Sequence, residues 1–235
     1  MTQTIRWSRF PDADAVAGEA VQRILHAAQV AIDRRGVFRM VLAGGSTPQK
    51  AYRLLSGCDA DWSRWHLYLG DERCLPVGDA ERNSTMIASA WLDKGQIPPE
   101  QVHWIPAESD PGAAAQAYAA VVRDVLPFDL VLLGMGEDGH TASLFPGQQH
   151  DPGQLVVAVD NAPKPPARRI SLNFAALNET RMLLVLVTGA GKCTAITDWR
   201  AGKALPVARL SCPAGIDVLL DNDAWCNQEE PPDAG

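Results

Sequence analysis

The chain reads FDLVLLGMGEDGHTASLFPG from residue 128 to residue 147. Its apolar run from Leu130 to Leu133 is typical of a strand that is covered on both faces. Gly134, Gly136 and Gly139 follow, and they allow backbone conformations that other residues resist. In open α/β sheets, ligands bind where strands end in this way. The stretch therefore predicts a buried strand that leads into a ligand-binding turn.

Strands and helices are predicted to alternate on both sides of this stretch. Apolar spacings of three and four residues predict helices, and short apolar runs predict strands. The expected helices cover 13–32, 46 onward, 83–92, 112–125 and 192–199, and the expected strands 39–43, 66–69, 102–105, 129–133, 155–159, 169–172, 182–187 and 216–220. This alternation predicts an α/β fold, with a Rossmann-like, mostly parallel sheet and helices on both faces. We expect one domain over residues 1–227 and a disordered tail over 228–235.

Composition and charge limit the partners that the chain can have. Of its 235 residues, 28 are acidic and 21 are basic, and the net charge is -7. Because Lys and Arg are scattered, without the basic run of a nucleic-acid arm, we expect no nucleic-acid partner. No apolar run approaches the ~18 residues of a membrane span, and the first residues lack the apolar core of a signal peptide. We expect a cytoplasmic protein with no membrane partner, a monomer or a weak homodimer.

The cysteines form no pattern typical of a metal site. They are odd in number, and no two lie at the close spacing of metal ligands. We therefore expect no metal, and we expect reduced thiols that are buried as small hydrophobic side chains. The five cysteines are Cys58, Cys74, Cys193, Cys212 and Cys226.

A second glycine-rich turn, Gly44-Gly45-Ser46-Thr47-Pro48, lies between a predicted strand and a predicted helix. The unpaired N–H groups and the dipole of a helix start attract phosphate. A tight turn capped by Ser or Thr explains the same residues without a ligand. Alone, the motif favours phosphate only slightly, and the following Lys50 is expected to be a solvated charge.

Charged residues follow the next predicted strand, in Gly70-Asp71-Glu72-Arg73. A solvated turn is the simpler interpretation of three consecutive charges. However, the carboxyl ends of parallel strands meet at one edge of a sheet, so this segment would stand beside the Gly44–Pro48 turn. We therefore expect Asp71 and Arg73 to face a ligand, and the guanidinium fork of Arg73 suits phosphate.

Two glycine patterns resemble nucleotide loops without meeting their requirements. Residues 134–139 match G-x-G-x-x-G, but their two acidic residues would repel a pyrophosphate, and Pro146 stops any following helix. Residues 187–192 resemble a P-loop that lacks its first glycine and the hydroxyl residue after the lysine. We expect no nucleotide cofactor, although Lys192 could serve as a point charge for a sugar phosphate.

Among the five histidines, His140 stands in the context most typical of catalysis. It follows the glycine turn at a strand end, two residues after Asp138, so it can lie in a cleft and be oriented by a carboxylate. An imidazole, with an ordinary pKa of about 6.5, suits general base work near neutral pH. The other histidines are expected to be structural or solvated.

Four motifs in this order resemble the 6-phosphogluconolactonase family, part of a wider group that includes glucosamine-6-phosphate deaminases. Three are the segments 44–48, 70–73 and 134–146, and the fourth is Lys-Pro-Pro-Ala-Arg-Arg-Ile-Ser at 164–171. The resemblance covers nearly the whole chain. It implies hydrolysis of 6-phospho-D-glucono-1,5-lactone to 6-phospho-D-gluconate, in the oxidative pentose phosphate pathway, without a required cofactor.

The chain departs from the deaminases at one position that matters for the reaction. Five residues after the histidine, the deaminases carry a glutamate of their ring-opening proton relay, whereas this chain has Phe145. A phenyl ring cannot carry a proton, which favours the lactonase branch. The fourth motif also departs slightly, with Ala167 in a segment that is usually proline-rich and Ser171 in place of threonine.

The chemistry of a lactone and the resemblance together suggest roles for the site residues. His140 would activate the water that attacks the lactone C1 and then protonate the ring oxygen, with Asp138 orienting the imidazole. Backbone N–H groups near Gly44 and Gly45, or near Gly136, would stabilise the oxyanion. The expected substrate-binding residues are Gly44, Gly45, Ser46, Thr47, Asp71, Arg73, Arg169 and Lys192.

Other functions remain open at this point. A deaminase or isomerase of amino sugar phosphates would release ammonia from glucosamine 6-phosphate. A non-catalytic sugar-phosphate sensor is disfavoured, because no helix-turn-helix precedes the domain and the net charge is acidic. A dehydrogenase would bind NAD(P)H.

Overall fold

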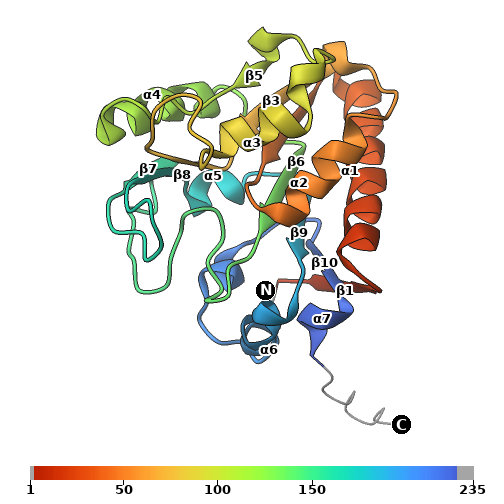
Figure 1. Ribbon diagram of the computed structural model, residues 1–235, viewed down its shortest axis with the longest axis vertical. Helices are drawn as coiled ribbons and strands as arrows, with labels where there is room; N and C mark the ends of the chain where they lie inside the picture. The colour runs from red at the N-terminus through yellow and green to blue at the C-terminus, as the bar shows by residue number, and fades with distance from the viewer. Residues whose placement is uncertain (1–2, 227–235) are drawn as a thin grey trace.

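A seven-stranded sheet forms the centre of the computed structural model, which describes residues 3–226 (Figure 1). The strand order is β1-β10-β9-β6-β2-β3-β5, and every neighbouring pair is parallel. The strands are β1 (Ile5–Phe10), β2 (Phe38–Leu42), β3 (Trp65–Leu69), β5 (Val102–His103), β6 (Leu130–Gly134), β9 (Leu183–Val187) and β10 (Ile216–Asp221). The predicted α/β fold with a mostly parallel sheet is confirmed.

Three further strands form a small antiparallel sheet of their own, in the order β4-β8-β7. They are β4 (Asp71–Arg73), β7 (Val156–Val159) and β8 (Arg169–Leu172). Two of them were predicted as strands, whereas the first was expected to be a turn. The register pairs Asp71 with Ser171 and Arg73 with Arg169. The small sheet therefore brings two predicted site segments, about a hundred residues apart, next to each other.

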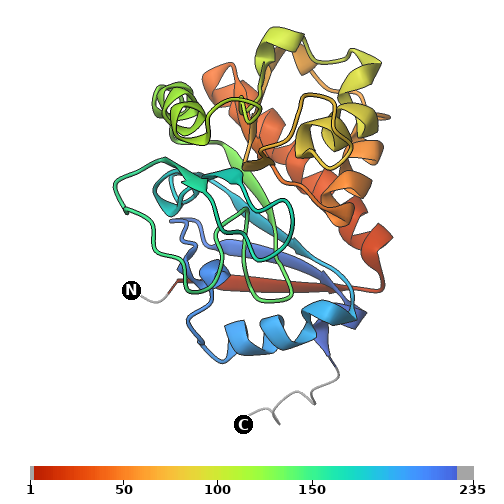
Figure 2. The ribbon, with the colours of Figure 1, turned by 60° about the vertical axis from the view of Figure 1, so that its left-hand side comes forward.

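Helices cover both faces of the main sheet (Figure 2). They are α1 (Ala13–Arg35), α2 (Ser46–Leu55), α3 (Asn83–Ala90), α4 (Pro111–Arg123), α5 (Phe174–Leu177), α6 (Cys193–Arg200) and α7 (Asn222–Trp225), with 3-10 turns η1 (Trp62–Arg64), η2 (Leu92–Lys94), η3 (Pro99–Gln101), η4 (Ala190–Lys192) and η5 (Pro206–Arg209). Arg23 of α1 binds Asp217 of β10, which lies opposite Arg6 in the register. The next residue of β1, Trp7, packs on Trp199 of α6. Because successive strand side chains point to opposite faces, α1 and α6 lie on opposite sides of the sheet.

Local signals explain where α1 begins and ends. The Asp12 carboxylate accepts hydrogen bonds from the amides of Asp14 and Ala15, which caps the helix start. Gly36 ends the helix with a φ of 74°, in the left-handed region that favours glycine. The predicted helix is confirmed and runs three residues further than expected. Its buried residues repeat at spacings of three and four, at Val16, Ala17, Ala20, Val21, Ile24, Ala28 and Ala31.

The centre of the sheet supplies much of the hydrophobic core. Every residue of β9 is buried, and the side chains from Leu183 to Val187 are at most 2% exposed. Burying each Val or Leu side chain stabilises the fold by roughly 1.5–3 kcal/mol. The apolar run from Leu130 to Leu133 in β6 is buried to the same degree. The prediction of a strand covered on both faces is therefore confirmed.

The expectation that all five cysteines are reduced is wrong for two of them. Cys193 and Cys226 form a disulfide, with Cα atoms 5.4 Å apart. Cys58, Cys74 and Cys212 are free. The paired residues are 33 positions apart, and a spacing of that length gives no signal in a single sequence.

Two predictions concern the membrane and the end of the chain. Within residues 3–226, no helix combines the length and the apolar character that crossing a bilayer requires. The tail predicted at 228–235 lies outside the described residues.

Candidate active site

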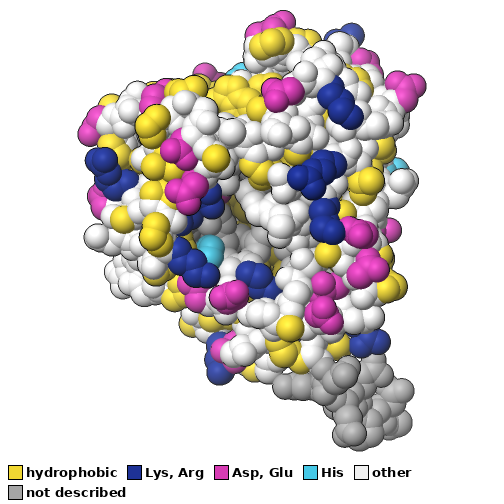
Figure 3. All heavy atoms as spheres, in the orientation of Figure 1, with side chains coloured by type: hydrophobic (Ala, Val, Ile, Leu, Met, Phe, Trp, Pro, Cys, Tyr) yellow, Lys and Arg dark blue, Asp and Glu magenta, His cyan; other side chains and the backbone are white. Residues whose placement is uncertain are grey.

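A cavity of about 240 Å³ opens at the carboxyl ends of four parallel strands, β2, β3, β6 and β9. In open α/β sheets this edge is where ligands bind. Figure 3 shows a hollow in this face, with Lys and Arg side chains and a histidine around it. All of the predicted site residues except Asp138 line the cavity, namely Gly44, Gly45, Ser46, Thr47, Asp71, Arg73, His140, Arg169 and Lys192.

The start of α2 offers unpaired amide groups to this cavity. Its N-cap, Gly45, has a φ of 105°, and no side chain caps the helix. Among residues 3–226, no acceptor receives the backbone N–H groups of Gly44, Gly45, Ser46 or Thr47. The Thr47 hydroxyl shares a hydrogen bond of 2.6 Å with the Thr188 hydroxyl, at the end of β9. A helix start of this kind is suited to an anion.

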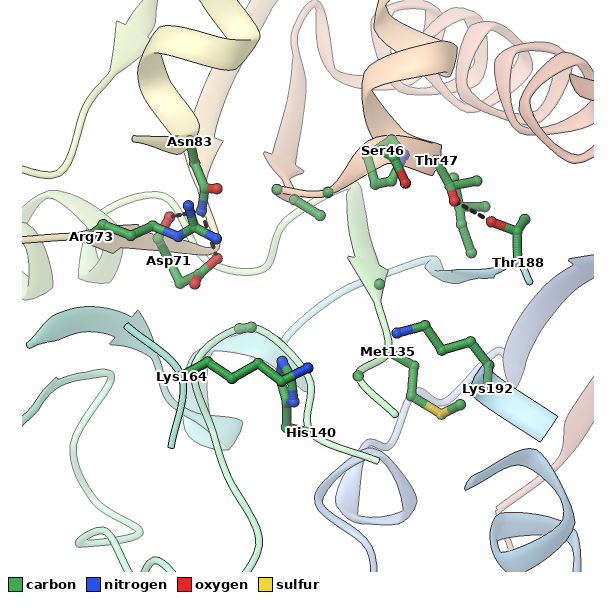
Figure 4. A pocket seen from close by; sticks show the side chains of 18 of the residues that line it. Ser46, Thr47, Asp71, Arg73, Asn83, Met135, His140, Lys164, Thr188 and Lys192 are labelled. Atoms are coloured by element: carbon green, nitrogen blue, oxygen red, sulfur yellow. Dashed lines mark hydrogen bonds between the residues drawn. The ribbon is translucent and has the colours of Figure 1, made fainter. Parts of the chain in front are cut away.

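Basic side chains reach the cavity from several elements. Figure 4 shows Lys164 and Lys192 extending into it from opposite sides. Burial lowers the pKa of Lys192, while the nearby Glu137 carboxylate opposes that shift. Within the described part of the chain, the Lys192 ammonium makes no hydrogen bond or ion pair with the protein. It is therefore available to an anionic ligand.

The Arg169 guanidinium is largely engaged with the protein itself. It is 6% exposed and donates hydrogen bonds to the carbonyl oxygens of Lys164 at 3.0 Å and Pro166 at 3.1 Å. Burial also lowers its pKa. The side chain thus fixes the 164–166 loop that carries Lys164, besides lining the cavity.

His140 and Asp138 form a hydrogen-bonded pair. The imidazole Nδ1 lies 2.5 Å from the Asp138 carboxylate oxygen Oδ1. Partial burial opposes ionisation of Asp138, but the hydrogen bonds from His140 outweigh it and lower the pKa of the carboxyl. Because an ionised carboxylate only accepts, Nδ1 must carry the donated hydrogen. In the neutral imidazole, the other nitrogen, Nε2, is then an acceptor.

The absence of a side chain at Gly136 leaves space for the His140 imidazole. A Cβ atom added to this glycine would overlap the His140 ring and lie 2.7 Å from the Asp138 carboxylate. The Gly136 N–H donates to the His140 carbonyl oxygen at 2.8 Å, so it is already occupied within the turn. No helix follows the 134–139 turn before Pro146, in agreement with its rejection as a dinucleotide loop.

Phe145 connects the histidine to the small sheet. Its ring centroid lies 4.6 Å from that of His140, and the Arg169 guanidinium lies 5.5 Å from the Phe145 centroid. The phenyl ring is 4% exposed. It therefore serves as an apolar support between the imidazole and the guanidinium.

Asp71 is held by two buried side chains. The Ser143 hydroxyl donates to its Oδ2 at 2.6 Å, and the Asn83 amide donates to its Oδ1 at 3.1 Å. Asp71 is 6% exposed, and burial raises its pKa against the opposing effect of the Ser143 hydrogen bond. Asn83 in turn lies so close to Gly44 that a Cβ there would overlap the amide. The Asp71 carboxyl group thus joins β4 to the start of α3 and to the loop of Ser143.

Metal ligands do not cluster in the described structure. Residues 3–226 contain no group of three or more His, Cys, Asp and Glu side chains arranged to hold a metal ion. The chemistry available in the cavity is that of an imidazole, carboxylates, backbone amides and cations.

Comparison with known families identifies the group to which this architecture corresponds. The family model described as glucosamine-6-phosphate isomerases/6-phosphogluconolactonase matches residues 11–219. The chain belongs to this family. Its match includes the four strand ends and every residue that lines the cavity.

Several members of the family are closely similar over nearly their whole length. The 6-phosphogluconolactonase of Mycobacterium tuberculosis is 40% identical, with 92% of each chain covered. That of Mycobacterium leprae is 38% identical, with 94% of each chain covered. The crystal structure of 6-phosphogluconolactonase from Thermotoga maritima is 27% identical, with a TM-score of 0.85 and coverage of 92% of this chain and 99% of that one.

Several residues of the site were not predicted from the sequence. Asn83 and Ser143, which hold Asp71, and Thr188, which binds Thr47, belong to this group. Asn83 starts a helix and Ser143 lies in a loop, where polar residues are ordinary. Lys164 was named only as the first residue of the fourth motif. The available signal was its place in the fourth motif shared with the 6-phosphogluconolactonase family.

Proposed function

We propose that this chain hydrolyses 6-phospho-D-glucono-1,5-lactone to 6-phospho-D-gluconate, the second step of the oxidative pentose phosphate pathway. The observation that carries the proposal is that His140, paired with Asp138, lines the same cavity as the unpaired start of α2. A general base and an anion site in one cavity suit a phosphorylated ester. Relatives 40% identical over 92% of the chain carry the name of this activity.

His140 acts first as a base and then as an acid in the proposed reaction. Its Nε2 removes a proton from water as the water oxygen bonds to the lactone C1. The resulting tetrahedral intermediate collapses, the bond from C1 to the ring oxygen breaks, and the imidazolium returns the proton to that oxygen. Asp138 stabilises the imidazolium and keeps Nδ1 as the donor. The products are a free hydroxyl and a carboxylic acid, which ionises.

The phosphate of the substrate is assigned to the start of α2. Amide groups of Ser46 and Thr47 and the helix dipole would bind it, together with Lys192, which lines the same cavity. Arg73 and Arg169 add positive charge to the cavity, and Arg169 also fixes the 164–166 loop. With the Gly136 N–H occupied, Gly44 and Gly45 remain as donors to the oxyanion. The Asp71 carboxyl group is assigned to a sugar hydroxyl.

The test is hydrolysis of freshly made lactone beside an enzyme-free blank. We expect turnover by the wild-type chain and a loss of about 100-fold or more in kcat for His140→Ala. The control is His26→Ala, which removes an exposed histidine of α1 and should leave kcat unchanged. Wild-type turnover by His140→Ala, after correction for spontaneous hydrolysis, would overturn the assignment of the base.

A deaminase is distinguished by a second substrate. Phe145 offers no group that could carry a proton beside His140. We therefore expect no ammonia from glucosamine 6-phosphate under conditions in which the lactone is hydrolysed. Ammonia release at a comparable rate would favour the deaminase.

A further inference from the structure

The loop that carries Lys192 is tied to the short helix α7 at both ends of that helix. At the start of α7, the Asp221 carboxylate accepts the Gly189 N–H at 3.0 Å and the Ala224 N–H at 2.8 Å. Asp221 is 4% exposed, so these hydrogen bonds are shielded from water. One buried carboxylate therefore connects the first residue of the 189–192 loop to α7.

The other end of α7 meets the same loop through the disulfide. Cys193 follows Lys192 directly, and its partner Cys226 follows the last residue of α7. Their Cα separation of 5.4 Å lies in the range that disulfides ordinarily span. Lys192 thus stands between two attachments to α7, a hydrogen-bonded one at Gly189 and a covalent one at Cys193.

We propose that Cys193 and Cys226 form a reversible redox-modification site that sets the position of Lys192 and, through it, the affinity for the phosphate of the substrate. The second half of this proposal rests on the proposed function. Both cysteines are partly exposed, so a thiol or a disulfide in solution can reach them. With the disulfide formed, the 189–192 loop is bound to α7 at both ends, whereas reduction removes the covalent link and keeps the hydrogen bonds to Asp221.

The oxidation is an ordinary thiol–disulfide exchange with a small disulfide such as oxidised glutathione. The thiolate of one cysteine attacks that disulfide and releases one glutathione thiol. The second cysteine then displaces the bound glutathione. One disulfide bond forms in the protein, one is broken in glutathione, and the two cysteine protons end on the two released thiols.

Reduction should loosen the loop without detaching α7. Trp225 remains packed against two side chains. The Arg200 guanidinium lies 4.0 Å from the centroid of the Trp225 ring, and the Trp7 and Trp225 ring centroids lie 6.1 Å apart. We therefore expect KM to rise by about three- to tenfold on reduction, because Lys192 would lose part of its charge-assisted hydrogen bond to the phosphate. The value of kcat should change less than about twofold.

The experiment compares the chain after equilibration with oxidised and with reduced glutathione. Thiol titration of the denatured protein should give three free thiols in the first case and all five cysteines in the second. The reduced form should have the higher KM, by about three- to tenfold, in the wild type and in Cys58→Ser. In Cys193→Ser or Cys226→Ser, KM should be the same after both treatments. Five thiols after oxidation, or an equal KM in both states, would overturn the proposal.

Labelling of Lys192 separates this proposal from the proposed function. Acetylation by a soluble ester, followed by mass spectrometry, should modify Lys192 faster in the reduced chain, while Lys50, ion-paired to Asp14 on the surface, should react equally in both states. A redox-dependent labelling rate in a chain without lactone turnover would support the redox site and refute the proposed function. Equal Lys192 labelling in an active chain would refute the redox site alone.

Discussion

The His140 ring can occupy its position because Gly136 has no side chain. Gly136→Ala places a methyl group in the volume of the imidazole and close to Asp138. We expect kcat to fall by about tenfold or more, because a displaced base loses its alignment with the water. Thermal unfolding should show that the variant still folds, since the clashing atoms are the ends of the His140 and Asp138 side chains and not backbone.

The matched control for this prediction is Gly18→Ala. No atom lies within 4 Å of a Cβ built at Gly18, which is part of α1. Activity should be unchanged, and the free energy of unfolding should rise by roughly 0.5–1 kcal/mol because alanine favours the helix. Full activity in Gly136→Ala would mean that the reaction does not use the imidazole in this position.

At the level of elements, Glu72 joins β4 to α3 and is a structural residue inside a predicted site motif. Its carboxylate is 0% exposed and accepts the N–H groups of Asn83 and Ser84, each at 2.8 Å. It also pairs with Arg82 at 3.3 Å. Glu72→Ala should lower the free energy of unfolding by about 3–5 kcal/mol, because it removes the buried partner of the Arg82 cation and the acceptor of two backbone N–H groups.

Glu108 provides the comparison for Glu72, since its carboxylate lies 3.0 Å from the same Arg82 guanidinium. Unlike Glu72, the Glu108 side chain is 40% exposed. Glu108→Ala should cost less than about 1 kcal/mol, as for exposed ion pairs. Urea denaturation of both variants measures the difference. Equal costs would show that burial of Glu72 does not control its contribution.

The success of sequence-based prediction differed from one element to another for physical reasons. The strands at the centre of the main sheet are continuous apolar runs, and their turns carry glycines, so both their positions and the cavity edge were predictable. β1 was missed because Arg6 and Arg9 interrupt its apolar pattern at the edge of the sheet. The separate small sheet was missed because strand propensity does not specify a partner.

The site residues also differ in whether local sequence predicts them. His140 and the Ser46–Thr47 helix start are marked by local glycines, and both were predicted to lie at the cavity. The contact of Ser143 with Asp71 joins positions 72 residues apart, and local sequence carries no signal for it. The Cys193–Cys226 pairing is hidden for the same reason.

For the whole molecule, Asp217 joins the first strand, the first helix and the last strand. It receives hydrogen bonds from Arg6 at 2.7 Å and 3.0 Å and pairs with Arg23 at 3.2 Å. Burial raises the pKa of Asp217, but these arginines outweigh burial and hold it below the ordinary 3.8. The ionised carboxylate therefore stabilises the fold above pH 3.8, and this contribution is lost as the pH falls through the lowered value.

Asp217→Asn should lower the free energy of unfolding by about 1 kcal/mol at neutral pH. The difference from wild type should shrink in acid below the ordinary carboxyl pKa, where the wild-type carboxyl also becomes protonated. Denaturation at several pH values measures it, with the exposed Asp59→Asn as a control that should have little effect. A cost that stays constant with pH would contradict the role of the charge.

The position of β10 between β1 and β9 affects how the chain can fold while it is being made. Translation completes β1 at Phe10, but its partner β10 is finished only at Asp221. β1 therefore has no strand to pair with during almost the entire synthesis, and it is accessible to chaperones and proteases. Nascent chains stalled before Ile216 should be cleaved within residues 5–10, whereas released full-length chains should resist.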